Sequence, residues 1–455
     1  MEMVLEFLRD VLSQPALLIG IMSCVGLIAL KRPFHKVMTG TLKPILGYLM
    51  LAAGAGVIVS NLDPLGKMIE HVFHITGVVP NNEAIVAVAQ KVLGVETMSI
   101  LVVGLLMNLC IARFTKFKYV FLTGHHSLFM ACLMSAVLGT AGLSGMELIL
   151  VGGFLMGAWS AISPAIGQSY TSKVTDGDEI AIGHFGSLGY YLSAWVAQYV
   201  GKAEDSTEDI EIPEKWGFLR DSTLSTALTM IVFYLIAAIA AGSEFVSTLS
   251  GDMSPYLYAV MSAMNFAVGV TIVYSGVRMI LGDLIPAFQG IATKIIPNAI
   301  PAVDCAVFFT YAPTAVVLGF LSSFIGGIIG MLILGAVGGV LIIPGLVPHF
   351  FCGATAGIYG NATGGRRGAA VGAFLNGLAI TFLPAMALPV LGQLGFQNTT
   401  FGDADFAVMG LVLGNAYEWV GMAGIYGIVA IAALVLIIPN FIKTKGKVIN
   451  YVEED

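Results

Sequence analysis

The apolar pattern of this chain is interrupted most sharply between Ser172 and Gly201. About 170 mostly apolar residues precede this point, enough for several membrane spans. The polar run 173–179 holds three carboxylates, and the apolar run 180–200 after it contains several glycines and a single histidine, His184. Non-helical backbone is tolerated at membrane depth only where it is buried in protein or lines a wet cavity. The pattern therefore predicts a re-entrant hairpin here rather than another crossing.

Apolar segments on both sides of this hairpin have the length of membrane-spanning helices. We predict crossings over 15–30, 42–60, 97–111, 120–138, 146–167, 223–241, 255–274, 299–320, 326–343, 369–390 and 406–439. Prolines, charges or glycines interrupt 61–96, 284–297 and 344–367, and the first of these is expected to dip into the membrane without a clean crossing. Residues 3–14 are expected to form an interfacial amphipathic helix.

These segments describe an all-α polytopic membrane protein with about 11 transmembrane helices, together with re-entrant hairpins and amphipathic helices. Clusters of lysine and arginine mark the cytoplasmic ends of membrane helices. Such clusters occur at 31–36, 113–118 and 443–447. With an odd number of crossings, the N-terminus is expected outside the cell. Loop 201–221 and the tail 441–455 are expected in the cytoplasm.

A short motif recurs in the two halves of the chain. Val78–Asn81 (VVPN) and Ile295–Asn298 (IIPN) each precede an acidic residue, Glu83 or Asp304. Paired interruptions at corresponding positions of two halves point to the binding site of a transporter. We predict a single membrane domain made of two pseudo-symmetric, inverted halves, 15–200 and 222–440.

Composition excludes several classes of function. Only 11% of the residues are charged and 57% are hydrophobic, whereas soluble domains carry about 25% charged residues. The net charge of −7 comes without a basic stripe, so no nucleic-acid partner is expected. No zinc-protease, Walker A, nucleophile-elbow or dinucleotide motif occurs, so we predict no autonomous catalysis, no cofactor and no metal. The five scattered cysteines form no CxxC pair and are interpreted as apolar core residues.

Few ionisable side chains are available within the apolar segments. An ionisable group at this depth indicates function, so His184 is a candidate site residue, with a structural helix-capping histidine as the alternative. A charge at the middle of the membrane costs ~2.5–3.5 kcal/mol or more, so Asp304 should face a cavity or a partner. The alternative is a carboxylate that caps the following helix. Of the adjacent His125 and His126, we expect His126 to face the lipid headgroups.

Thr355 and Asn361 lie in the glycine-rich stretch 353–365. Small residues in a turn permit close backbone approach to a ligand, although plain turn chemistry explains the same composition. The polar groups in the apolar segments are histidines, an acid and amides, with little fixed positive charge. Such groups suit a small polyhydroxylated ligand better than a metal or a phosphate.

Several motifs occur in order along the chain: FLTGH at 121–125, VTDG at 174–177 with IGH at 182–184, DCA at 304–306 with YAP at 311–313, and IIPG at 342–345. Together they resemble the membrane component (enzyme IIC) of the ascorbate-type bacterial phosphotransferase system. The wider family also includes galactitol permeases. The resemblance covers almost the whole chain.

This resemblance implies a homodimer among the lipids of the bacterial cytoplasmic membrane. In each chain a core would hold the substrate, and a scaffold part would mediate dimerisation. The core would carry L-ascorbate or a related sugar acid or polyol inward by elevator-like alternating access. A cytoplasmic IIB protein would then donate phosphate to the sugar from a phosphocysteine. A IIA protein would supply that phosphate to IIB from phosphoenolpyruvate.

By similarity the ligand would be held by His125, His184 and Asp304, by Asn82–Glu83, and by the turn near Thr355. The segment 82–83 departs from the ascorbate pattern, which has a threonine and a tyrosine there. Glu83 is expected to bind sugar hydroxyls instead.

Two phenylalanines also depart from that pattern. Phe185 directly follows the hairpin histidine, and Phe129 lies four positions after His125; the pattern has glutamine at both positions. Losing two amides that bind a polar ligand should cost at least ~1–3 kcal/mol per unpaired group if the same ligand binds in the same way. The two rings are expected to stack on a sugar face.

Two other classes of function remain as alternatives, and the bare residues allow the first of them equally well. An ion-coupled secondary transporter of a small polar solute would use Asp304 and a histidine as a proton relay. An intramembrane enzyme or a purely structural protein is disfavoured by the lack of a catalytic motif. The site hypothesis makes a geometric prediction: His184 and Asp304 should line one cavity and lie within ~10 Å of each other.

Overall fold

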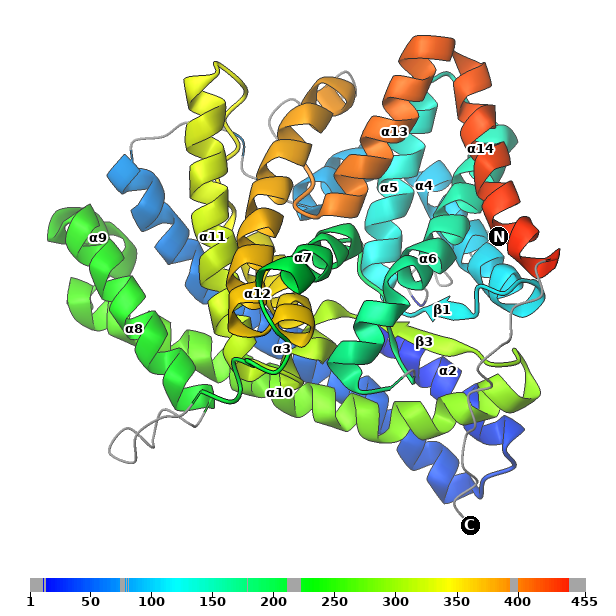
Figure 1. Cartoon of the computed structure of the whole chain (residues 1–455), viewed down its shortest axis with the longest axis horizontal. Coiled ribbons are helices and arrows are strands. Elements are labelled where there is room, and N and C mark those ends of the chain that lie inside the picture. The colour runs from blue at the N-terminus through cyan, green and yellow to red at the C-terminus, as the bar shows by residue number, and fades with distance from the viewer. Residues whose placement is uncertain are drawn as a thin grey trace.

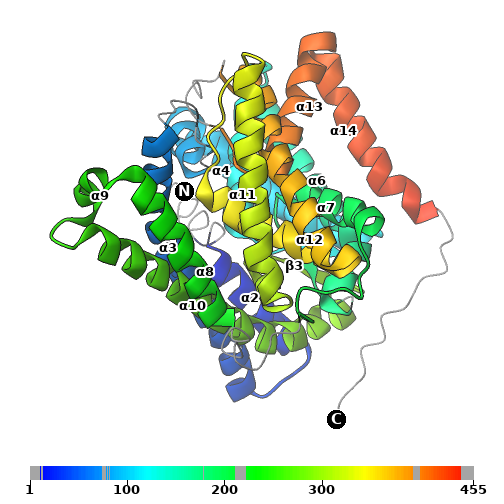
Figure 2. The same cartoon turned by 60° about the vertical axis from the view of Figure 1, so that its left-hand side comes forward.

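The structure is a computed structural model that describes residues 11, 14–73, 78, 80, 82–177, 179–210, 222–392 and 400–441. Within these ranges the chain is almost entirely helical. Figure 1 and Figure 2 show two groups of helices that meet side by side. The helix predicted at 3–14 lies outside the described residues except for residues 11 and 14, as do the second half of loop 201–221 and the tail beyond 441.

The first group, which we call the α3/α10 group, is built on two helices of 40 residues that pack along each other. Its elements are α2 (Pro15–Ala29), α3 (Phe34–Phe73), α8 (Ser222–Ala241), α9 (Ser243–Ser250) and α10 (Pro255–Lys294). Glycines bring the backbones of α3 and α10 into contact. A Cβ on Gly54 would lie 2.7 Å from the carbonyl oxygen of Gly269, and one on Gly47 would lie 2.8 Å from that of Gly276. Small residues allow membrane helices this close approach.

The second group, which we call the α5/α12 group, contains the other described helices (Figure 1). They are α4 (Asn82–Phe114), α5 (Gly124–Thr140), α6 (Gly145–Thr175), α7 (Ser187–Val200), α11 (Pro313–Ala336), α12 (Leu346–Gly392), α13 (Ala404–Val420) and α14 (Met422–Ile437), with the 3-10 helices η2 (Cys305–Thr310) and η3 (Ile438–Phe441). Helix α12 packs along both α7 and α11, and α4 packs along α6. Phe308, Phe320 and Phe350 are buried where η2, α11 and α12 meet.

Three short strands lie within the α5/α12 group: β1 (Tyr119–Phe121), β2 (Ala181–Ile182) and β3 (Ile300–Val303). They pair in parallel in the order β1-β3-β2, with Tyr119 opposite Ile300 and Ala181 opposite Ala302. Every residue of β3 is buried. Because the strands are parallel, their carboxyl ends meet at one edge, and the chain leaves all three strands at the same place. The predicted all-α pattern did not include this small sheet.

Several predicted boundaries are wrong. The predicted crossing 299–320 is instead β3, then η2, then the start of α11. The interruption predicted from residue 61 lies further on, because α3 continues through Pro64 to Phe73 and α4 begins at Asn82. The predicted turn 353–365 is mostly helix, since α12 breaks only at Gly364 and Gly365, where the positive φ of Gly365 (59°) suits glycine. The last predicted crossing, 406–439, is divided between α13 and α14.

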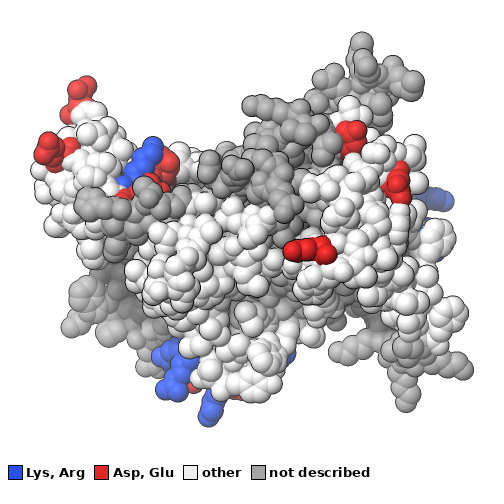
Figure 3. All heavy atoms as spheres, turned by 90° about the horizontal axis from the view of Figure 1, so that it is seen from above, with Lys and Arg blue, Asp and Glu red and all other residues white. Residues whose placement is uncertain are grey.

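By length and composition, seven of the described helices are able to cross a membrane, or eight if the bent pair Met230–Ala241 and Ser243–Ser250 forms one span. This number is lower than the predicted ~11. Helix α7 has 14 residues and is therefore ~21 Å long, shorter than the ~30 Å hydrocarbon layer. The segment that follows β2 is thus too short to cross by itself. Viewed from above, the surface shows few charged side chains (Figure 3), as expected of a membrane protein.

Candidate functional site

The polar residues of the candidate site follow the carboxyl ends of the three parallel strands. His125 lies in the first turn of α5 after β1, His184 lies between β2 and α7, and Asp304 directly follows β3. In open α/β sheets, ligands bind just outside the carboxyl ends of parallel strands, because chain segments converge there. The small sheet likewise brings together residues that are far apart in the sequence.

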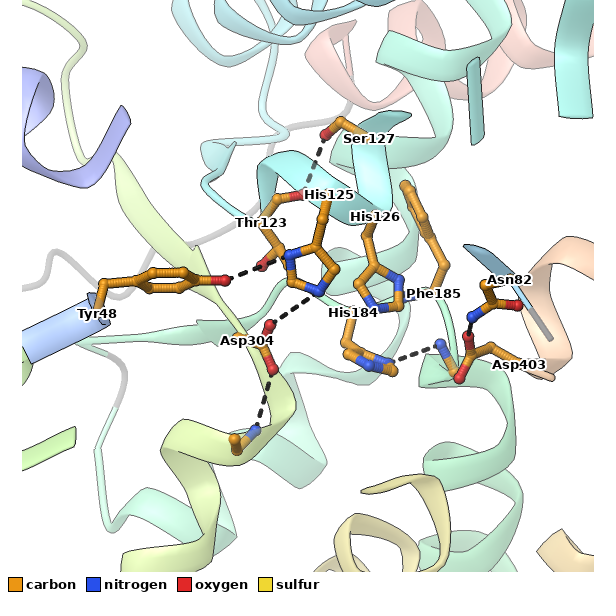
Figure 4. A network of polar contacts seen from close by, with 12 residues as sticks. Tyr48, Asn82, Thr123, His125, His126, Ser127, His184, Phe185, Asp304 and Asp403 are labelled. Carbon is orange, nitrogen blue, oxygen red and sulfur yellow. Dashed lines mark hydrogen bonds and ion pairs between the residues drawn. The ribbon is translucent and has the colours of Figure 1, made fainter. Parts of the chain in front are cut away.

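The two carboxylate oxygens of Asp304 have different partners (Figure 4). Its Oδ1 accepts a hydrogen bond from the Ala306 N–H at 3.2 Å and so caps η2. Its Oδ2 lies 3.5 Å from Nε2 of His125. Nδ1 of the same histidine lies 3.3 Å from the hydroxyl of Tyr48 on α3. Asp304 therefore caps η2, as the alternative interpretation predicted, and through His125 its carboxylate is also connected to the α3/α10 group.

Backbone amides of the hairpin orient two histidines. The Gly186 N–H donates to Nδ1 of His184 at 3.1 Å, and the Phe185 N–H donates to Nδ1 of His126 at 3.3 Å. A backbone N–H can only donate, so each Nδ1 must accept, and each neutral imidazole carries its proton on Nε2. The Tyr190 hydroxyl makes a second bond to Nδ1 of His184 at 2.8 Å. The centroids of the two imidazole rings are 3.8 Å apart, so the rings are in direct contact.

A second buried carboxylate, Asp403, lies at the N-terminus of α13. Its Oδ2 accepts from Nδ2 of Asn82 at 2.6 Å, and its Oδ1 accepts from Sγ of Cys352 at 2.7 Å. The side-chain oxygen of Asn82 accepts in turn from the Gly402 N–H at 2.9 Å. Asn82 therefore connects the start of α4 to the segment before α13, and Asp403 connects both to α12.

These groups surround a cavity of about 910 Å³ between the two helix groups, at the upper end of the usual size of small-molecule sites. One wall is a face of α3 that includes Tyr48, Leu51, Leu62 and Gly66. The opposite wall carries the candidate polar residues and comes from the α5/α12 group: His125, His126, Phe129, His184, Asp304, Cys305 and Asp403. The prediction that His184 and Asp304 line one cavity is confirmed.

Most of the residues predicted to bind the ligand lie at this cavity. Asn82, His125, Phe129, His184 and Asp304 all line it. The side-chain oxygen of Asn82 is hydrogen-bonded to Gly402 and its amide group to Asp403. Its position therefore indicates that it orients other residues of the site.

Phe185 and Thr355, also predicted to bind the ligand, are not brought to the cavity wall. Phe185 is fully buried and stacks on Phe121, with ring centroids 4.6 Å apart, rather than facing the cavity. Thr355 is buried, and its hydroxyl donates to the carbonyl of Phe351 at 2.8 Å. Glu83 lies in the first turn of α4, and its side chain is outside the described part of the structure.

Asn361 has a structural role. Its side-chain oxygen accepts from the Thr207 N–H at 2.8 Å, and its amide donates to Ser206 at 3.0 Å. Glu208, which follows Thr207 in the chain, accepts hydrogen bonds from the N–H groups of Thr314 and Ala315 and so caps α11. The acidic loop thus connects the N-terminus of α11 to the part of α12 just before its break.

Sequence reasoning missed four residues of the site. His126 was expected to face lipid headgroups, which is wrong: its side chain is only 3% exposed and contacts His184. Tyr48 and Cys305 gave no signal among many apolar neighbours. Asp403 did carry a signal, because it is an acid close to the start of the predicted crossing 406–439.

The chain also matches known proteins over the whole of this site. Residues 10–405 match the family described as PTS (phosphotransferase system) sugar-specific permease component. The chain belongs to this family. A similar protein is the ascorbate-specific PTS system EIIC component of Mycoplasma pneumoniae, which is 26% identical over 473 aligned residues covering 90% of this chain and 70% of that protein. This permease is therefore a multi-pass membrane component of a sugar phosphotransferase system, which acts together with IIA and IIB components.

Proposed function

We propose that this permease carries L-ascorbate or a related sugar acid or polyol into the cell and presents it for phosphorylation. The supporting observation is a cavity lined by His126 and His184, whose neutral rings carry their protons on Nε2, and by the carboxylates of Asp304 and Asp403. A sugar hydroxyl both donates and accepts, so it can bridge an imidazole N–H and a carboxylate oxygen. Several hydroxyls on one small molecule would satisfy the set.

Phe129 supplies an apolar surface beside these polar groups. It lines the cavity, and its ring centroid lies 5.8 Å from that of His125 in an edge-to-face arrangement. Sugar pockets need such a surface because the C–H groups of a sugar must also leave water.

We further propose that the α5/α12 group moves relative to the α3/α10 group in an elevator-like cycle. The residues that would hold the sugar come from the α5/α12 group, where the three strands fix them to one another. The α3 wall contacts the candidate binding residues through the hydrogen bond between Tyr48 and His125. Its lining is apolar at Leu51, Ala52, Val59 and Leu62, and it carries charged side chains from Asp63 onward. The apolar part would permit sliding. A homodimer with the N-terminus outside and the C-terminus in the cytoplasm is part of the same proposal.

The last step of this proposal takes place on the cytoplasmic side. A sugar hydroxyl attacks the phosphocysteine of a separate IIB protein, so that a P–O bond forms as the P–S bond breaks. The cysteine leaves as a thiolate, and the hydroxyl proton passes to solvent or to a base. The IIA protein then restores the phosphocysteine with phosphate from phosphoenolpyruvate.

The test is a transport assay in inside-out and right-side-out vesicles containing the purified permease. Radiolabelled ascorbate, sugar acids, hexitols and pentitols are supplied with or without phosphoenolpyruvate and the phosphocarrier proteins. We expect one of these compounds to accumulate as its phosphate, and only when the complete phosphate relay is present. Failure of every compound under the complete conditions would contradict the proposal.

An ion-coupled secondary transporter of a small polar solute is the second candidate. The observation that favours it is the contact of His125 with Asp304, since a histidine–carboxylate pair at membrane depth is a common proton relay. The same vesicles distinguish the two. Accumulation of unmodified solute, driven by a proton or sodium gradient without phosphoenolpyruvate, would support this candidate instead.

A further inference from the structure

Three potential metal ligands lie together beside the cavity, and two of them, His184 and Asp403, line it. His184, Cys352 and Asp403 each offer one ligand atom, and the three atoms lie within 4.8 Å of one another. All three side chains are buried, with exposed fractions of 5% or less. They come from the hairpin before α7, from α12 and from the N-terminus of α13, so the fold itself holds them together.

The charge around these ligands favours a cation. Asp304 and Asp403 both line the cavity, and among its described lining residues the one lysine or arginine is Lys67. Lys67 lies on α3 and already pairs with Asp63 at 2.7 Å. Buried carboxylates without a positive partner are costly, because desolvation penalises the charge. A bound cation would remove that cost.

The hydrogen bonds define which bonds a metal would replace. Nδ1 of His184 carries no proton, because it accepts from the Gly186 N–H, and a metal on this atom would take the place of the Gly186 and Tyr190 donors. The Cys352 thiol donates to Oδ1 of Asp403 at 2.7 Å, which places a single proton between sulfur and oxygen. A divalent metal would displace this proton. One thiolate and one carboxylate, with a neutral imidazole, would then balance the two positive charges of the metal.

We propose that this cavity binds a divalent cation of the zinc class at His184, Cys352 and Asp403. Sulfur, nitrogen and oxygen ligands on three side chains are typical of zinc sites, which keep a fourth position open when they bind a further ligand. His184 and Asp403 line the cavity, so that fourth position faces it. Tetrahedral ligation needs ~3.5 Å between sulfur and oxygen, so Sγ of Cys352 and Oδ1 of Asp403 move apart by less than ~1 Å.

A competing set, His184 with Asp304 and Cys305, also has its ligand atoms within 4.8 Å. In that set both oxygens of Asp304 are already engaged, one by the Ala306 N–H and one by His125. A metal there would remove the cap of η2 or the contact to His125. Both sets would displace the donors to Nδ1 of His184. Beyond that, the first set loses the thiol–carboxylate bond between its own two ligands and keeps the Asn82 bond to Oδ2 of Asp403, so we assign the site to it.

The experiment uses the full-length permease purified in detergent, with any histidine tag removed and after treatment with a chelator. Zinc content is measured by mass spectrometry after dialysis against Zn²⁺, and Co²⁺ is added separately as a spectroscopic probe. We expect about one Zn²⁺ per chain, with release of about one proton at neutral pH. We also expect a near-ultraviolet thiolate-to-cobalt band with d–d bands of tetrahedral intensity.

The variant Cys352→Ser should lose the thiolate band and bind Zn²⁺ at least about tenfold more weakly. Asp403→Asn should weaken binding while keeping the band. The matched control is Cys305→Ser, which also changes a buried cysteine beside His184 and should keep both the band and the stoichiometry. Thermal unfolding of each variant without metal shows whether the fold is retained, and the exposed Cys110→Ser serves as a second folded reference.

Absence of a thiolate band in the wild-type permease would overturn the inference. So would a band that survives Cys352→Ser and disappears in Cys305→Ser. These measurements need no sugar and no phosphocarrier protein, so their outcome is independent of the transport proposal.

Discussion

His184 and Asp304 present polar atoms within 4.8 Å of each other although 120 positions separate them in the chain. The cause is the parallel pairing of β2 with β3, which sets Ile182 beside Val303 and releases the chain from both strands at the same edge. A strand of two residues and one of four are therefore sufficient to place a donor next to an acceptor. His125, His126 and Asp403 line the same cavity as this pair.

The carboxylate of Asp304 should be more important for transport than an exposed one. We expect Asp304→Asn to lower sugar uptake by about tenfold or more, equal to about 1.4 kcal/mol, because it removes a charged acceptor from the site. The fold should survive, because asparagine is as good a helix cap as aspartate and can still accept from the Ala306 N–H. Uptake into vesicles measures the effect.

The control for this substitution is Asp252→Asn, because Asp252 is exposed in the turn between α9 and α10. It removes the same charge far from the cavity and should leave uptake unchanged. Equal uptake by both variants would show that Asp304 does not take part in the site.

The glycine contacts between α3 and α10 should limit stability. A Cβ on Gly54 would meet backbone of α10 at 2.7 Å, which no side-chain rotation can relieve. We expect Gly54→Val to destabilise the protein by about 1–3 kcal/mol and to lower the midpoint of thermal unfolding in detergent. Gly56→Val adds the same β-branched side chain to the same helix but meets nothing within 4 Å. A similar midpoint for both variants would contradict the close-packing argument.

The hydropathy of the sequence predicts most of the membrane helices, because each must present a long apolar surface. It fails where local rules are overridden by packing. Pro44 and Pro64 lie inside α3, since neighbouring helices can satisfy the freed backbone groups. It also misses β3, because a short apolar run has no periodicity that distinguishes a buried strand from a helix.

The same apolar pattern allowed part of the candidate site to be predicted. An ionisable side chain such as His184 or Asp304 is conspicuous in an apolar run, so its role can be inferred from the sequence alone. His126 is equally conspicuous, but its orientation depends on the Phe185 N–H that binds it, which only the fold reveals. The inverted halves, 15–200 and 222–440, stay a prediction.

Asn82 should act by holding Asp403 in place. Asn82→Ala would leave Oδ2 of Asp403 and the Gly402 N–H without their partner, and a buried unpaired group costs about 1–3 kcal/mol. We expect weaker sugar binding together with a lower unfolding midpoint, measured by calorimetry and thermal unfolding. The matched control is Asn61→Ala, because the Asn61 amide bonds only within its own helix, to Val57 and Ser60. Normal binding by Asn82→Ala would exclude this role.

The two phenylalanines that replace glutamine should respond differently to restoration of the amide. Phe129 lines the cavity, so Phe129→Gln places a donor and an acceptor where a ligand can use them. We expect this variant to fold and to bind ascorbate more tightly than the wild type, by roughly tenfold for one added hydrogen bond. Isothermal titration with ascorbate and with a hexitol measures the change.

Phe185→Gln should instead damage the fold. Phe185 is fully buried, stacks on Phe121 and has no contact with the cavity, so the new amide would be buried without a partner. Loss of the ring and the unpaired amide together should cost about 3 kcal/mol or more. We therefore expect a strongly lowered unfolding midpoint and no gain in ascorbate binding. Tighter ascorbate binding by Phe185→Gln, with the stability unchanged, would mean that this ring turns toward the ligand during transport.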